Sequence, residues 1–257
     1  MVNTSEKDMD ALLEQVHSLH KKAVAGNTNA VQDTHQLLEQ LRSNYPNQPI
    51  LDAYHGSTML LIARDETKPL DKLRWAQTGL ELLDEAVNAD PHNTVIRLIR
   101  GKSSFRLPEK HFQRAQTTIE DYTFVMDEER RGNGFLDKQL YWQLMYELGE
   151  LHYKIDQKQT AIDYWKRLKQ ETSNADFQRL LHLKLMQIEG KEYVDPDPTP
   201  EMKSPISILI SKAARATGNE LQYWAEQRKL AKEERAEEEE PGPRNYIRKR
   251  RKKRWSY

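Results

Sequence analysis

Apolar residues recur along this chain at steps of three and four, which is the spacing of one face of an α-helix. No comparable stretch alternates apolar and polar residues, as a half-buried strand would. The pattern therefore predicts an all-α protein. The clearest apolar stripes are Leu73, Ala76, Leu80, Leu83 and Val87; Leu140, Leu144, Leu148, Leu151 and Ile155; and the shorter Ala30, Thr34, Leu38 and Leu41.

Glycine, proline and asparagine interrupt these stripes at intervals that suit helical hairpins. The breaks are Gly26 to Asn29, Tyr45 to Asn47, Asp90 to Asn93 and Gly132 to Gly134. Proline cannot continue a helix interior, and glycine favours turns, so each break ends one helix and opens the next. The residues between Asp65 and Asp71, with Pro69 inside, are predicted to form a loop. The predicted helices cover 6–25, 29–44, 50–64, 72–89, 94–106, 111–129, 137–155, 158–171 and 175–189.

One spacing occurs twice. Pro46 lies ten residues before Gly56, and Pro91 lies ten residues before Gly101, so that the two copies are offset by 45 residues. Gly149 follows 48 residues after Gly101, again inside an amphipathic stretch. A repeat of this length is typical of stacked helical hairpins. Because glycine disfavours a helix interior, we expect these three glycines to mark close contacts between helices.

The residues of these units resemble the tetratricopeptide repeat family. In the unit from Trp142 to Ala175, Leu148-Gly149 stands at the Leu-Gly pair of the family, Ala161 at its small site and Trp165 at its aromatic site. In an earlier unit Ala86 and Pro91 stand at the late alanine and the terminal proline. The resemblance covers about 10–190 and implies an α-solenoid of about four helix pairs. The units differ from the 34-residue period of the family, with about eleven extra residues before the helix of 72–89. Met145 and Arg97 stand where the family has tryptophan, and Ser173 where it has proline.

The same resemblance implies a binding surface, because the first helices of successive units line a concave groove in that family. Lys102 and Arg106 are one helical turn apart and could together hold a carboxylate, such as the end of a peptide. The alternative is that these are solvated charges on a helix surface. The residues expected to face the groove are Leu98, Lys102, Phe105, Arg106, Gln143, Tyr146, Glu150 and Lys154.

The sequence changes character after residue 190. We divide the chain into a repeat domain at 1–190, a Pro/Asp-rich linker at 191–204, capping and charged helices at 205–240, and a disordered basic tail at 241–257. Ser204-Pro205 is a typical helix start. The helix that follows has an apolar face, which could cover the last exposed face of the solenoid or dock in a groove of this protein or of a partner. This face consists of Ile206, Leu209, Ile210 and Ala213.

The tail concentrates positive charge in a protein whose formal net charge is zero. Eight cations fall within eleven residues, flanked by aromatic side chains. Such a segment can neutralise phosphates while its aromatic rings stack on unpaired bases. An anionic membrane surface, an import receptor, the acidic run at Glu233 to Glu240 or solvent alone are the other interpretations. The candidate polyanion-binding residues are Arg244, Arg248, Lys249, Arg250, Arg251, Lys252, Lys253, Arg254 and Trp255.

The chain offers little to support catalysis. It has no cysteine, no phosphate-binding glycine loop and no nucleophile motif. His17 and His20 share a helix face, but a third metal ligand is not evident. We therefore expect no enzyme activity, no cofactor and no metal. The polar amino-terminal segment does not predict a secretory signal, and the longest apolar run is far too short to span a bilayer, so a cytoplasmic protein without a membrane partner is expected.

These observations favour a non-enzymatic scaffold or adaptor that binds a partner protein or peptide in the groove, with the tail as a second contact. The alternative is an RNA- or ribosome-associated factor that binds mainly through the basic tail.

Overall fold

The computed structural model describes residues 4–132 and 135–190, and this part of the chain is entirely helical. The predicted linker, the helices of 205–240 and the basic tail lie outside the described residues. Within them, the all-α prediction is confirmed. The helices are α1 (Thr4–Val24), α2 (Thr28–Asn44), α3 (Pro49–Asp65), α4 (Pro69–Ala89), α5 (Thr94–Phe105), α6 (Glu109–Phe112), α7 (Ala115–Arg130), α8 (Lys138–Lys154), α9 (Lys158–Glu171) and α10 (Ala175–Ile188).

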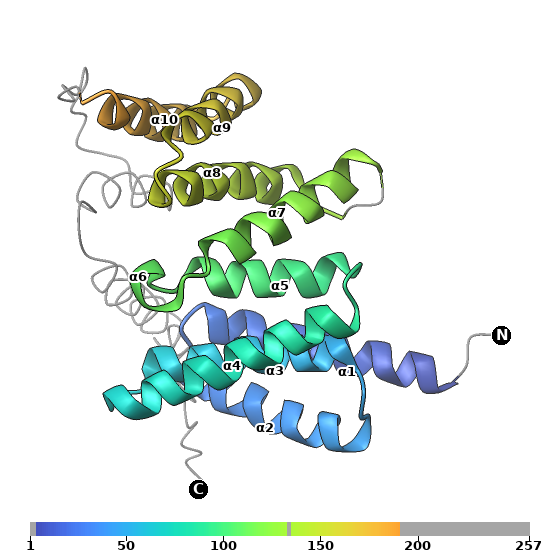
Figure 1. Ribbon diagram of the computed structural model, residues 1–257. Helices are drawn as coiled ribbons and strands as arrows, with labels where there is room; N and C mark the ends of the chain where they lie inside the picture. Colours follow the sequence, from blue (N-terminus) through green and yellow to red (C-terminus); the bar gives the residue numbers. More distant parts are fainter. Residues whose placement is uncertain (1–3, 133–134, 191–257) are drawn as a thin grey trace, which may run out of the picture.

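The helices form successive hairpins that stack into an α-solenoid (Figure 1). The pairs are α1 with α2, α3 with α4, α5 with α7, and α8 with α9, and α10 packs on α9. The first helices also contact each other along the stack, since α3 packs against both α1 and α5. Four pairs and a single following helix agree with the number predicted from the sequence.

The repeated glycines lie at close helix contacts, as predicted. A Cβ atom on Gly56 would lie 2.6 Å from the carbonyl oxygen of Gly79, and one on Gly101 would lie 2.6 Å from the ring of Tyr122. A Cβ on Gly149 would overlap the indole of Trp165. Each glycine belongs to the first helix of a pair and meets the second helix, so that the missing side chain sets the spacing within the hairpin. Sequence reasoning did not identify Gly79 of α4, which faces Gly56 of α3, so that a glycine lies on each side of this helix contact.

The start of α4 was predicted wrongly. The predicted loop of 65–71 is shorter than expected, because α4 begins at Pro69 rather than at residue 72. Proline fits the first turn of a helix, where its missing N–H would have no partner in any case. The apolar stripe is also interrupted there, since Leu73 is 43% exposed while Ala76 is buried.

The predicted helix of 111–129 is two helices. The short α6 ends at Gln113, whose φ of 50° places it in the left-handed region. A carboxylate oxygen of Glu109 then accepts a hydrogen bond of 2.7 Å from the N–H of Ala115 and thereby caps α7. A left-handed glutamine gives no sequence signal comparable to that of glycine, so the break could not be predicted.

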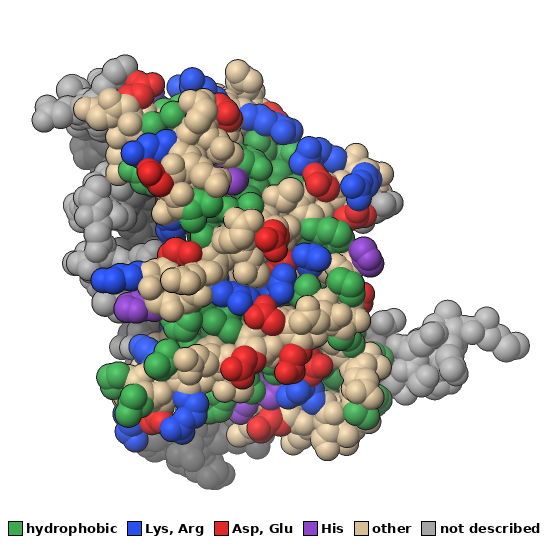
Figure 2. Space-filling model, viewed as in Figure 1, with side chains coloured by type: hydrophobic (Ala, Val, Ile, Leu, Met, Phe, Trp, Pro, Cys, Tyr) green, Lys and Arg blue, Asp and Glu red, His purple; other side chains and the backbone are tan. Residues whose placement is uncertain are grey.

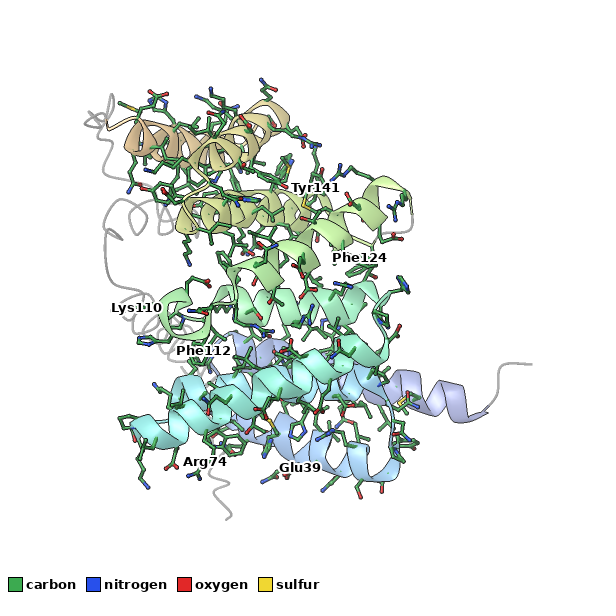
Figure 3. The ribbon with its side chains drawn as sticks, in the orientation of Figure 1. Glu39, Arg74, Lys110, Phe112, Phe124 and Tyr141 are labelled. Atoms are coloured by element: carbon green, nitrogen blue, oxygen red, sulfur yellow. The ribbon has the colours of Figure 1, made fainter. Side chains whose placement is uncertain are left out.

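A buried ion network joins α4, α5 and α7. Asp121 of α7 is fully buried, and its carboxylate accepts hydrogen bonds of 2.8 Å from both Nε and Nη2 of Arg100. Arg97 donates a third, at 3.0 Å, and its guanidinium carbon lies 4.5 Å from the ring centre of Phe124, which is labelled on α7 in Figure 3. Asp84 of α4 continues the network by accepting from Arg100 and Arg114. These arginines are therefore structural.

A second polar chain joins α2 to α3. Nη1 of Arg42 lies 2.9 Å from Nδ1 of His55, and Nε2 of His55 lies 2.9 Å from Nδ1 of His35. Nε2 of His35 then lies 3.5 Å from Glu39. Burial, together with the charge of Arg42, lowers the pKa of His55 to about 3, so this ring is neutral at physiological pH.

None of the helices within the described ranges is both long and apolar enough to cross a membrane.

Candidate functional site

Polar side chains connect the first helices of successive pairs into one continuous surface, which we call the first-helix face; it comprises α1, α3, α5, α8 and α10. At its amino-terminal end the hydroxyl of Ser103 donates to Ser57 at 3.0 Å, and Ser57 lies 2.9 Å from Nε2 of His20. The Ser57 oxygen accepts from Ser103, and its hydroxyl can donate to the His20 ring when Nε2 carries no proton. Three repeats are linked by this one chain of hydrogen bonds.

The charge state of His20 agrees with this arrangement. Burial, together with the positive charge of Arg106 and the neighbouring His17, lowers the pKa of His20 to about 4. A neutral imidazole offers Nε2 as an acceptor when the proton is on Nδ1. We therefore assign His20 as neutral. Within the described residues, no three metal-ligating side chains come together, so the pair of His17 and His20 has no third ligand there.

The middle of the face is occupied by a buried carboxylate that sequence reasoning missed. Both oxygens of Glu147 lie 3.0 Å from Nζ of Lys102, and its side chain is only 8% exposed. The hydroxyl of Tyr122 donates to Glu147 at 2.6 Å, and Gln143 donates at 2.8 Å. Burial lowers the pKa of Lys102, and burial beside Glu147 raises that of Tyr122 well above its usual value. Gln143 and Glu147 are four residues apart, which was the available sequence signal.

Arg106 is left in a cationic environment. It lies close enough to His20, Lys102 and Tyr122 for its charge to lower the pKa of all three. Among the described residues, no hydrogen bond or ion pair joins its guanidinium to a carboxylate, because Glu147 is engaged by Lys102. The side chain is only partly exposed. We predicted that Lys102 and Arg106 hold one incoming carboxylate together. Since Lys102 is already paired with Glu147, Arg106 is the cation of this pair that remains for an incoming carboxylate.

The other predicted groove residues divide between surface and core. Leu98 and Phe105 pack against the largest hydrophobic cluster, and Nζ of Lys154 lies 5.3 Å from the ring centre of Phe105. Tyr146 also packs against that cluster, with its ring centre 6.4 Å from that of Trp165. Glu150 forms an ion pair of 2.9 Å with Lys184 of α10. Gln143 and Lys154 are the most exposed members of the predicted set.

The site therefore extends along the stack of the first helices. Its amino-terminal end is neutral and rich in hydroxyl groups, Arg106 adds a positive charge, and Glu150 and Lys184 continue it as a neutral ion pair. Charges of both signs are also interspersed over the visible face of Figure 2. Such a surface suits recognition of an extended polar segment of another molecule.

No family model matches this chain. No curated protein matches it either. Among solved structures it is similar in helix arrangement to one described as "Crystal structure of MamA", with a TM-score of 0.44 and 11% sequence identity. The match covers 82% of this chain and 94% of the MamA chain.

Proposed function

We propose that this chain is a divergent tetratricopeptide-like scaffold of the cytoplasm that binds a protein partner and carries out no chemistry itself. The partner would lie along the first-helix face as an extended or helical peptide. Stacked hairpins support this proposal because they hold polar side chains of five helices at fixed spacing. The basic tail would add a second contact and raise the effective concentration of the partner.

The observation that carries the proposal is the guanidinium of Arg106, which has no carboxylate partner in the described part of the chain. Lys102 already has its carboxylate in Glu147, so an acidic group on the partner would neutralise Arg106 without breaking an internal ion pair. A guanidinium binds a carboxylate through two parallel hydrogen bonds, which fixes the orientation of the bound group. We therefore propose that a carboxylate of the partner, from an acidic side chain or a chain end, is the anchor.

Affinity capture with the full-length protein, followed by binding measurements on the captured peptide, tests this function. Changing Arg106→Glu should weaken binding by roughly 10- to 100-fold, which is the contribution expected of a charge-assisted hydrogen bond. The matched control is Arg131→Glu, at an exposed arginine after α7 and away from the first-helix face. Amidation of the partner carboxylate should weaken binding to the wild type but not to the Arg106→Glu variant, where it removes the repulsion between two carboxylates. Equal binding by the Arg106→Glu and wild-type proteins would refute the anchor.

A second candidate function has its own observation, the eight cations in eleven residues near the carboxyl end. Binding to RNA or to the ribosome through this segment would be strongly salt-dependent, because phosphate neutralisation releases counterions. Capture repeated after nuclease treatment separates the two functions. Protein partners that remain after nuclease treatment favour the scaffold, and loss of the whole signal favours nucleic acid.

A further inference from the structure

The amino-terminal turn of α4 projects from the stack and exposes apolar side chains. Leu70 is 78% exposed and Leu73 is 43% exposed, whereas most large apolar residues of the described chain are buried or partly buried. Lys68, Lys72 and Arg74 surround them and are exposed as well. Figure 1 shows this end of α4 reaching past its neighbours at the lower left, where apolar and basic side chains gather in Figure 2. We call residues 68–74 the knob.

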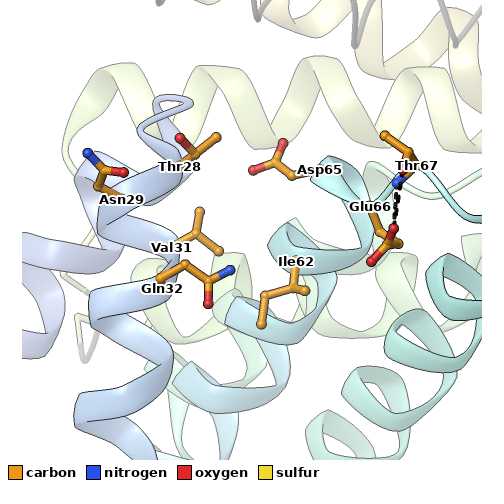
Figure 4. Close-up of a pocket in the computed structure, with 8 residues that line it drawn as sticks. All are labelled: Thr28, Asn29, Val31, Gln32, Ile62, Asp65, Glu66 and Thr67. Carbon is orange, nitrogen blue, oxygen red and sulfur yellow. Dashed lines mark hydrogen bonds between the residues drawn. The ribbon is translucent and has the colours of Figure 1, made fainter.

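A hollow of about 360 Å³ lies beside the knob, between the start of α2 and the end of α3. Val31 and Ile62 are buried and give it apolar walls, while Asp65 and Glu66 stand at its edge (Figure 4). Glu66 accepts hydrogen bonds from the N–H groups of Thr67 and Lys68, which lower its pKa and keep it ionised. The hollow is lined by Thr28, Asn29, Val31, Gln32, Ile62, Asp65, Glu66 and Thr67.

The knob and the hollow have complementary chemistry. The knob presents two leucines ringed by cations. The hollow offers the edges of two aliphatic side chains, Val31 and Ile62, among polar ones, and its negative charge comes from Glu66, since both oxygens of Asp65 are already paired with Arg64. The two are consecutive in the chain, so the knob of one molecule cannot turn back into the hollow beside it without unwinding α4. A contact of knob with knob would bring three cations from each copy together, with only Asp71 to offset them.

We propose that the occupant of the hollow is the knob of a second copy of this chain. Because both surfaces lie at one corner of the molecule, a two-fold axis beside that corner lets each copy insert its knob into the hollow of the other. Two equal contacts form at once, and their areas add. The residues preceding α4, which lengthen the repeat beyond the family period, thereby acquire a role in self-association.

Two variants test the proposal in the full-length protein. Leu70→Asp removes the apolar tip of the knob, and Gln32→Arg places a cation in the hollow, where it repels the cations of the knob. Both positions are exposed, so neither change should affect folding. Phe135→Asp is the matched control, because Phe135 is 50% exposed and lies before α8. Sedimentation velocity up to roughly 500 µM covers the range expected for a small interface.

The wild type and the Phe135→Asp control should dimerise, and each of the other two variants should raise the dissociation constant at least about tenfold. Mixing the two variants gives the decisive result. The hollow of the Leu70→Asp copy is intact, and so is the knob of the Gln32→Arg copy, so an equimolar mixture should form a heterodimer of intermediate affinity. Dye-labelled copies would report it by energy transfer.

Three results would overturn the proposal. They are a wild type that stays monomeric over the whole range, a dimer that is indifferent to Leu70→Asp, and a mixture that remains monomeric when each variant alone is monomeric. This test does not depend on the peptide site, since Arg106 belongs neither to the knob nor to the residues that line the hollow, and binding at Arg106 can fail without affecting dimerisation.

Discussion

Replacing Asp121 with alanine should destabilise the fold strongly. Asp121 is 0% exposed and accepts three hydrogen bonds, two from Arg100 and one from Arg97. Removing one partner of a buried ion pair typically costs about 3–5 kcal/mol, because the remaining charge is left without compensation. Arg100 keeps Asp84 at 3.1 Å, and Arg97 keeps the carbonyl of Pro91 at 2.7 Å. We therefore expect the lower end, about 3 kcal/mol of unfolding free energy.

Thermal and urea unfolding followed by circular dichroism measures this loss. For a domain of this size each kcal/mol lowers Tm by about 2–4 °C, so a fall of about 6–12 °C is expected. Glu120→Gln, at the exposed neighbouring position, should change the free energy by less than about 0.5 kcal/mol. Replacing Arg100 and Asp121 together by leucine should recover most of the loss, since the more buried cation is removed with its partner, Asp84 keeps Arg114, and the partly exposed Arg97 keeps the carbonyl of Pro91. An unfolding free energy of the Asp121→Ala variant within about 1 kcal/mol of the wild-type value would refute the reasoning.

Three further perturbations have defined outcomes. Gly149→Ala forces a methyl group into the indole of Trp165 and should cost about 1–3 kcal/mol; unchanged urea denaturation would contradict the close contact. Stability should fall on acidification from pH 6.5 towards 4, because the pKa values of His20 and His55 in the folded protein lie below those in the unfolded chain, which therefore binds protons first. Melting temperatures measured across this pH range check the prediction, and a melting temperature that does not change with pH would contradict it. Deletion of 241–257 should leave the melting temperature unchanged and sharply reduce binding to RNA. Tight RNA binding by the truncated protein with little dependence on salt would exclude the tail as the RNA-binding segment.

The hairpins could be predicted because their signals are local. Proline and glycine ended the helices, and apolar spacing identified the buried faces. The helix α9 has its predicted bounds, α5 ends one residue earlier than predicted, and α8 is shorter by one residue at each end. The failures have local causes as well. The left-handed Gln113 divided a predicted helix, and Pro69 extended α4 backwards because proline is as well suited to a first turn as to a loop.

The candidate site could be predicted only in part, because its chemistry depends on residues far apart in the chain. Lys102 and Arg106 were placed on the first-helix face from register alone. That Lys102 is neutralised by Glu147, 45 residues later, follows from how α5 and α8 stack, and the repeat offsets of 45 and 48 residues do not say which side chains of two units meet. The contact of His20 with Ser57 likewise joins residues 37 apart. Arg106 can be recognised as the cation without a described carboxylate partner only after the partners of Lys102 and His20 are known.

The chain from Arg42 through His55 and His35 to Glu39 has a fixed direction of hydrogen donation. A guanidinium can only donate, so Nδ1 of the neutral His55 must accept, and its proton must be on Nε2. The same constraint passes to His35, whose remaining N–H is directed at Glu39. One arginine therefore dictates the tautomers of two rings. Nitrogen chemical shifts would report Nε2–H on both histidines. Replacing Arg42 with glutamine, whose amide can also accept, would free the tautomer of His55, while the carboxylate of Glu39 would still favour Nε2–H on His35.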